Sequence, residues 1–185
     1  RSEDTRFLTG QGRYVDDLPF DGMAQAFILR SPHAHARILG IDTTAATGAP
    51  GVLAILTGAD QAGAGITPMA PYVSANFRNS EPFAFTPHPP LALDRVRYAG
   101  QPVALVIARD AAEARDAAEL IDVDYDALPA VTTAKAALAE GAVLVNDEVP
   151  GNVCLRWRVG DSAVSDRAFA AAAHVARLDL HNHRV

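Results

Sequence analysis

Residues 95–128 read RVRYAGQPVALVIARDAAEARDAAELIDVDYDAL. The first part, 95–109, is strongly apolar but is interrupted at Gly100-Gln101-Pro102, which predicts two strand pieces joined by a turn or bulge that leaves Gln101 in the open. Asp110 is a suitable cap for a helix over 110–121, and Glu113 three residues later completes a pattern like a capping box. The stretch therefore predicts strands followed by a capped helix.

The predicted helix has one face of small apolar residues, made by Ala114, Ala117, Ala118 and Ile121. A narrow stripe of this kind lets a helix lie close against a sheet. A strand over 122–128 follows, with Val123 and Tyr125 pointing inward and the aspartates outward. The helix and strand pattern thus predicts a helix packed tightly on a sheet.

The same patterns continue on both sides of this unit. They predict strands over 23–30, 36–42, 52–57, 152–159 and 175–180, and helices over 43–47, 133–139 and 166–173, the last capped by Ser165. Two strand–helix–strand crossovers favour mixed strand pairing. The expected fold class is α+β, a mixed sheet with packed helices.

One long segment, residues 58–90, shows neither the apolar period of a helix nor that of a strand. It contains six prolines and Gly63 and Gly65, with the prolines at 68, 71, 82, 87, 89 and 90. A stretch of this length without regular structure is usually functional or packed on a partner. One hypothesis is therefore a stand-alone protein-binding module that docks a partner through 58–90.

Composition excludes several classes of protein. The 185 residues are 49% hydrophobic, which allows a sizeable core, and the net charge of −6 argues against a nucleic-acid backbone as the partner. Cys154 is the single cysteine, so the chain forms no internal disulfide and builds no iron–sulfur cluster alone. No apolar run is long enough to span a membrane, and the absence of a signal-peptide pattern predicts a cytoplasmic location. The abrupt ends, Arg1 and Val185, indicate a piece of something longer.

Two His-x-His pairs are the candidates for a metal site. His33 with His35, and His181 with His183, would each point two imidazoles to one face of a strand. Neither pair has a Cys or Glu at ligand spacing, so ordinary core or surface histidines are favoured. A small metalloenzyme using all four histidines stays an alternative.

Other candidate sites have simpler interpretations. The aspartates at 122, 124 and 126 follow plain strand alternation, which favours a solvated sheet face over a calcium site. The glycine pairs at 10 and 12 and at 63 and 65 do not complete a dinucleotide fingerprint. No catalytic triad can be built around Ser162 or Ser165, and Cys154 reads as a small hydrophobe. The residues alone thus indicate a globular module with no catalytic, cofactor-binding or metal site.

Several stretches, in order, resemble the molybdopterin-binding large subunit of the molybdenum hydroxylases, the family of xanthine dehydrogenase, aldehyde oxidase and aerobic carbon monoxide dehydrogenase. They are 1–17 (RSEDTRFLTGQGRYVDD), 30–38 (RSPHAHARI), 50–60 (PGVLAILTGAD), 90–92 (PLA) with 96–104 (VRYAGQPVA), and 117–119 (AAE) with 124–131 (DYDALPAV). The resemblance implies the α/β-hammerhead domain that opens this subunit. The expected division is an N-terminal extension over 1–20, the hammerhead domain over 21–160, and over 161–185 the start of the connection to the molybdopterin-binding domains.

The family's function is implied in the same way. Its enzymes oxidise carbon monoxide, aldehydes or N-heterocycles with oxygen from water, and electrons pass from molybdenum through two [2Fe–2S] clusters to FAD. The family's catalytic and cofactor motifs do not occur in this chain, so the resemblance implies a chain that is inactive alone, with the molybdenum cofactor in the full subunit and the clusters and FAD on small and medium partner subunits or domains. The expected role of the chain's signature loops is domain packing or subunit contact, with interface candidates Arg97, Tyr98, Gly100, Gln101, His33 and His35.

Overall fold

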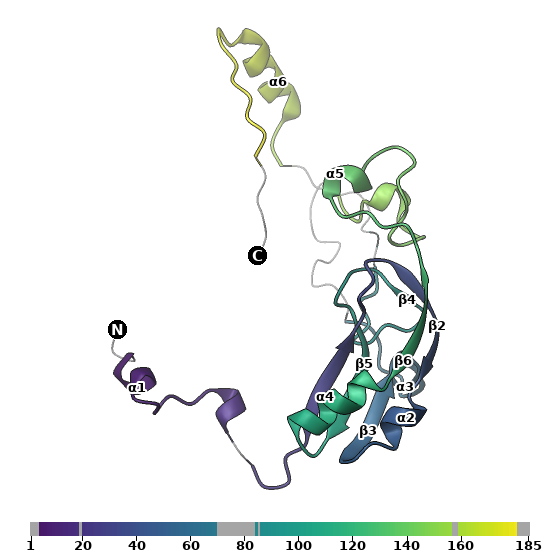
Figure 1. Ribbon diagram of the computed structural model, residues 1–185. Helices are drawn as coiled ribbons and strands as arrows, with labels where there is room; N and C mark the ends of the chain where they lie inside the picture. Colours follow the sequence, from purple (N-terminus) through teal and green to yellow (C-terminus); the bar gives the residue numbers. More distant parts are fainter. Residues whose placement is uncertain (1–3, 19, 70–83, 85, 157–158, 181–185) are drawn as a thin grey trace.

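The computed structural model describes residues 4–18, 20–69, 84, 86–156 and 159–180. Its strands form two three-stranded sheets (Figure 1). The first sheet has the order β1 (Gln25–Arg30), β5 (Pro102–Ala108), β3 (Val52–Thr57), and the second has the order β4 (Arg95–Val96), β2 (Ala36–Asp42), β6 (Asp122–Ala127). The combination of helices with small sheets confirms the predicted α+β class.

The pairing of the strands differs from the prediction. All the paired strands are antiparallel, not mixed. The reason lies in the two expected strand–helix–strand units. The unit β2–α2–β3, with α2 spanning Thr44–Thr47, leaves the second sheet and enters the first, and β5–α4–β6, with α4 spanning Ala111–Glu119, does the reverse. Because each unit joins two different sheets, neither makes a parallel pair.

Helix α4 covers one face of the first sheet, against β1 and β5 (Figure 1). The Asp110 carboxylate accepts a hydrogen bond from the Glu113 amide at 2.8 Å, which confirms the predicted cap. The Glu113 side chain does not return to the cap but accepts a bond from Arg109 at 2.6 Å, so the capping-box pattern is only half realised. The predicted small-residue stripe is confirmed, since Ala114, Ala117 and Ala118 are all buried.

The core consists of two clusters of mostly small residues. One joins α4 and α2 to β5 through Ala46, Ala104, Val106 and Ala108. The other joins the two sheets, and its buried members are Ala36, Ala92, Val96 and Val103. Residues of this size allow the backbones of neighbouring elements to approach closely, so the core tolerates little added volume.

Several predicted elements differ from the structure. The segment 58–90, expected to lack regular structure, begins with helix α3 (Gly58–Gly63), because Thr57 and Asp60 form a capping box in which the Asp60 carboxylate accepts from the Thr57 amide at 2.8 Å. The hydrogen bond from the Thr57 hydroxyl at 2.7 Å, followed by this bond from the amide, lowers the pKa of Asp60. The predicted helix over 133–139 is confirmed in shorter form as α5 (Ala134–Ala137), capped by the Thr133 hydroxyl.

The C-terminal predictions are partly wrong. The expected strand over 152–159 is replaced at its start by a 3-10 turn, η2 (Pro150–Asn152), and residues 153–156 form no strand; 157 and 158 lie outside the described residues. Asn152 has a φ of 57° and binds three backbone groups with its side chain, so extended structure cannot begin there. Helix α6 (Ser162–Ala171) is longer than predicted and is capped by Asp161 rather than Ser165.

The predicted strand over 175–180 is not formed either. Its residues are exposed, as are those of α6, and both extend away from the two sheets (Figure 1). At the other end, the loop-rich first twenty residues contain two short helices, α1 (Asp4–Leu8) and η1 (Val15–Asp17). In the described parts of the chain, no helix has the length and apolar character needed to cross a membrane.

Candidate interaction site

The turn at Gly100-Gln101-Pro102 is held against the end of β1. The Gly100 amide donates to the Ser31 carbonyl at 2.8 Å, the Ser31 amide donates to the Gln101 carbonyl at 2.9 Å, and the Arg30 guanidinium donates to the Gly100 carbonyl at 2.9 Å. Gly100 has a φ of +86°, which favours glycine. The β1–β5 register shifts at Leu29/Arg30, so the predicted turn with a bulge is confirmed.

The expectation that Gln101 stands in the open is wrong. Its side chain is buried, and Oε1 accepts a hydrogen bond from the Arg97 amide at 2.7 Å. The turn folds back toward Arg97, and the Gln101 side chain supplies the acceptor that the Arg97 amide needs once it is removed from water. Gln101 therefore fixes the backbone at Arg97, while the neighbouring Tyr98 remains exposed.

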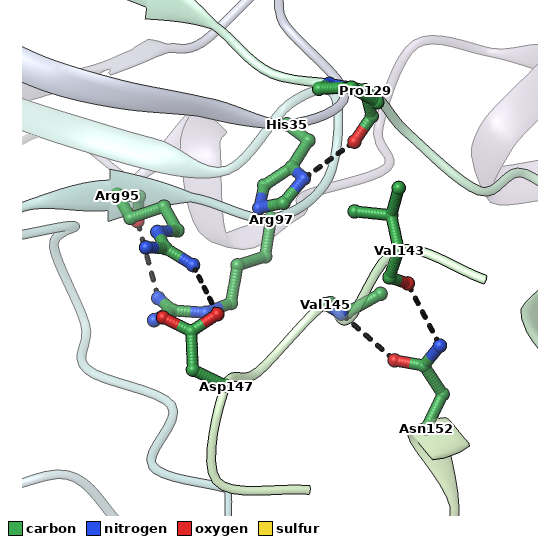
Figure 2. A network of polar contacts seen from close by, with 8 residues as sticks. All are labelled: His35, Arg95, Arg97, Pro129, Val143, Val145, Asp147 and Asn152. Carbon is green, nitrogen blue, oxygen red and sulfur yellow. Dashed lines mark hydrogen bonds and ion pairs between the residues drawn. The ribbon is translucent and has the colours of Figure 1, made fainter. Parts of the chain in front are cut away.

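Arg97 belongs to a cluster of charged side chains from three parts of the sequence (Figure 2). Its Nη1 donates to the Arg95 carbonyl at 3.4 Å, and Arg95 Nη1 is 3.1 Å from Asp147 Oδ1. The hydrogen bond from Arg95, followed by its charge, lowers the pKa of Asp147, and the charges of Arg97 and His35 add smaller effects in the same direction. Asp147 is thus an ion-pair partner of Arg95, with a weaker charge effect from Arg97, and its side chain is 67% exposed.

The two histidines of the first His-x-His pair have different neighbours. His35 is buried, and its ring Nδ1 is 2.8 Å from the Pro129 carbonyl, to which it donates (Figure 2). His33 instead packs on the Tyr125 ring, with the ring centroids 4.8 Å apart. The two imidazole rings therefore have separate partners and do not converge on one binding site. His181 and His183 lie outside the described residues, and in the described portion no group of three His, Cys, Asp or Glu side chains could hold a metal ion.

Two buried polar atoms beside this cluster have no hydrogen-bond partner within the described part of the chain. They are Nε2 of His35 and Nε of Arg97. A buried donor or acceptor without a partner costs about 1–3 kcal/mol, so such atoms are uncommon in folded proteins. Arg97 also lines a cavity of about 130 Å³ with Tyr98, Gln101, His88 and Asn146. The sequence-selected residues Arg97, Tyr98 and Gln101 thus meet at one cavity.

A second hollow was not foreseen from the sequence. It is an apolar groove of about 300 Å³ on the first sheet, lined by Ile28, Leu56 and Leu105 and bordered by Ile66 and Leu91. The alternation of strand side chains places these three on the face opposite α4, since Phe27, Ile55 and Val106 pack toward the helix. Because these strands carry apolar side chains on both faces, the sequence does not indicate which face of the sheet α4 leaves uncovered.

The remaining sequence candidates have ordinary surroundings. Asp122 and Asp124 are exposed, and Asp126 pairs with Arg37 at 3.0 Å, as expected for a solvated sheet face. Cys154 is a partly buried free cysteine, so the small-hydrophobe interpretation holds only in part.

Tyr125 gives the site a measurable dependence on pH. Burial raises the pKa of this phenol above 10.0, and the Ser31 side chain opposes the rise in part. Above about pH 10 the unfolded chain loses the phenol proton first, so the free energy of unfolding should fall as the pH rises further. Tyr125→Phe should reduce this fall when unfolding is followed between about pH 9 and 11. Tyr98→Phe, at an exposed ring, is the matched control, and an equal effect of both changes would contradict the assignment.

Comparisons with known proteins identify the domain. The family model described as "Aldehyde oxidase and xanthine dehydrogenase, a/b hammerhead domain" matches residues 9–129. The nicotine 6-hydroxylase large subunit of Paenarthrobacter nicotinovorans is 40% identical over 185 residues, which is 100% of this chain and 22% of that protein. The carbon monoxide dehydrogenase large chain of Afipia carboxidovorans is 36% identical over 197 residues, which cover 100% of this chain and 23% of that protein.

Solved structures agree with this result. A crystal structure of Cu,Mo-CO dehydrogenase superposes with a TM-score of 0.75 at 35% identity, covering 94% of this chain and 22% of that one. The crystal structure of quinoline 2-oxidoreductase from Pseudomonas putida 86 superposes with a TM-score of 0.69 at 46% identity, covering 83% of this chain and 19% of that one. The chain spans about a fifth of the length of the relatives it matches. It belongs to the aldehyde oxidase and xanthine dehydrogenase a/b hammerhead family.

Proposed function

We propose that this chain is the N-terminal hammerhead part of the molybdopterin-binding large subunit of a molybdenum-dependent hydroxylase or dehydrogenase. Its substrate class is carbon monoxide, an aldehyde or an N-heterocycle, oxidised with oxygen from water. The observation that supports this proposal is the match of the entire chain to about a fifth of the length of two such large subunits. In the proposed division, residues 1–20 form an extension, 21–160 the hammerhead domain and 161–185 the connection to the domains that follow.

The chain's own residues do not fit the cofactors of such an enzyme. One cysteine cannot hold a [2Fe–2S] cluster, which needs four protein ligands. The cavity at Arg97, about 130 Å³, is smaller than the roughly 300 Å³ at which small-molecule pockets begin. The groove on the first sheet is lined mostly by aliphatic side chains and offers few groups to orient a pterin. We therefore assign the molybdenum cofactor to the rest of the subunit, and the clusters and FAD to partner subunits in the cytoplasm.

In this proposal the domain acts by packing, and the isolated chain has no activity. The Arg97–Gln101 region, with Tyr98, Gly100 and His33, contacts the rest of the assembly, whereas the buried His35 makes no direct contact with it. Two features support this role. The cavity lined by Arg97 offers polar groups that a further group could bind, and the apolar groove is open to water.

The proposal is tested first by the size of the native protein. An antibody raised against this chain should detect, on a denaturing gel of source cells, a band several times larger than the chain itself. A band of the chain's own size would contradict the proposal and favour the stand-alone binding module that uses 58–90.

The packing role is tested by Gln101→Ala in the complete large subunit. Loss of the bond to the Arg97 amide should release the backbone at Arg97 and lower the yield of assembled complex and its total activity in parallel. The rate per assembled complex should stay unchanged, because no reacting group is touched. Asp110→Ala is the matched control, since it removes a similar bond to a backbone amide, worth about 1 kcal/mol, on α4. Equal yields for the two variants would contradict a role for Gln101 beyond stability.

A further inference from the structure

The cluster around Arg97 carries more positive than negative charge. Asp147 forms an ion pair with Arg95 and lies mostly in solvent, and the charge of Arg97 acts on it more weakly. His35, His88 and the Tyr98 phenol are further titratable groups near this cluster. Among the described residues, the Arg97 guanidinium therefore has no carboxylate of its own.

The cavity beside Arg97 has the size and chemistry to receive such a group. Its volume of about 130 Å³ equals roughly four water molecules at about 30 Å³ each, which leaves room for a short acidic side chain but not for a large ligand. Arg97, His88, Gln101 and Asn146 supply N–H groups around it, and Tyr98 adds a hydroxyl. The buried Nε of Arg97 has no acceptor within the residues that the structure describes. Guanidinium and carboxylate groups match in geometry and form paired hydrogen bonds.

We propose that this cavity receives one Asp or Glu side chain from the part of the large subunit that lies outside residues 1–185. This inference rests on the proposed function, because the occupant is another part of the same subunit. Charge complementarity argues for a carboxylate, and the chain's coverage of only 22% of its nicotine 6-hydroxylase relative leaves most of such a subunit available to supply it. The contact would neutralise Arg97 and fix the Gly100–Pro102 turn against the rest of the subunit.

The test introduces an amine in place of the guanidinium. Arg97→Lys keeps the positive charge, and a carbodiimide joins a lysine amine to a carboxylate in direct contact with it, with loss of one water. The variant is made in the complete large subunit, assembled with its partners, treated with carbodiimide and digested for mass spectrometry. We expect a cross-linked peptide that joins position 97 to an Asp or Glu outside 1–185 of the same subunit, and no such peptide from Arg97→Gln.

A matched control lies in the same cluster. Arg95→Lys should give a peptide joined to Asp147, because Arg95 Nη1 is 3.1 Å from that carboxylate, and this product shows that the reagent reaches the site. With this control positive, a link from position 97 only to Asp147, a link to a partner subunit, or no link at all would each overturn the proposal. These results leave the proposed function standing if the variant subunit still assembles with its partners at full size. The proposed function fails separately, if no subunit larger than this chain exists.

Discussion

Replacing Gly58 by alanine is expected to lower the free energy of unfolding of this chain by about 3 kcal/mol or more, at the upper end of overpacking effects. Gly58 is the first residue of α3 and is buried. A Cβ atom there would overlap the Ala92 carbonyl group and crowd the Leu93 Cα, which are backbone atoms that cannot rotate away. The conflict arises from close approach of two backbones, not from an unusual φ.

Neither backbone can move aside without further loss. The start of α3 is fixed by the Thr57–Asp60 capping box, with bonds of 2.8 and 2.7 Å. On the other side, the Ala92 amide donates to the Pro102 carbonyl at 2.8 Å, and Ala92 belongs to the cluster that joins the sheets. Shifting Ala92 would thus disturb the start of β5. The strain therefore extends from α3 to the turn that holds Gln101.

Denaturant unfolding of the 185-residue chain measures this effect. Gly63→Ala is the matched control, because it lies at the end of the same helix with open space around it and an ordinary helical φ. Alanine in a helix is favoured over glycine by about 0.5–1 kcal/mol, so the control should be neutral or slightly stabilising. Similar midpoints for Gly58→Ala and the unchanged chain would show that the two backbones do not meet as described.

The contact at Gly58 also shows where sequence reasoning ends. The T-x-x-D pattern at Thr57–Asp60 was available in the sequence, but the prolines of 58–90 led to an expectation without a helix. The approach to Ala92 could not be predicted, because no local period relates residues so far apart. By contrast, the strands over 36–42 and 52–57 match β2 and β3, since their apolar patterns are local and strong.

The prediction of a strand in the C-terminal segment was wrong for a different reason. Residues 175–180 alternate as a strand does, yet a strand forms only where a neighbour accepts its hydrogen bonds. The described parts of the chain provide no such neighbour, and the side chains of 175–180 are exposed. The alternation can be read from residues 175–180 alone, whereas strand pairing also requires a neighbouring strand.

The sequence named residues of the candidate site but not their geometry. Arg97, Tyr98 and Gln101 were selected by resemblance, and they line one cavity. Their sequence spacing could not reveal that Gln101 turns inward to the Arg97 amide, because this depends on the return of the chain at Gly100. Asp147 was not foreseen at all. It reaches Arg95 from a loop after α5, and nothing near Asp147 in the sequence marks it as a partner.

Replacing Ala117 by leucine is the second change expected to have a large effect, with a loss of about 1–3 kcal/mol in the free energy of unfolding. Ala117 is fully buried in the cluster between α4 and the first sheet, where Ala104, Val106 and Ala108 of β5 are fully buried as well. Leucine is about as good a helix former as alanine, so the loss reports the missing space and not the helix itself.

The same helix supplies the control. Ala112→Leu places the same side chain on an exposed position of α4 and should change stability by less than about 0.5 kcal/mol. The double substitution should cost no more than Ala117→Leu alone. If Ala112→Leu were as damaging as Ala117→Leu, the close approach of α4 to the sheet would not be the cause. The large difference expected between these two alanines follows from the small-residue stripe that the sequence already indicated, since a helix that packs this closely leaves no volume on its buried face.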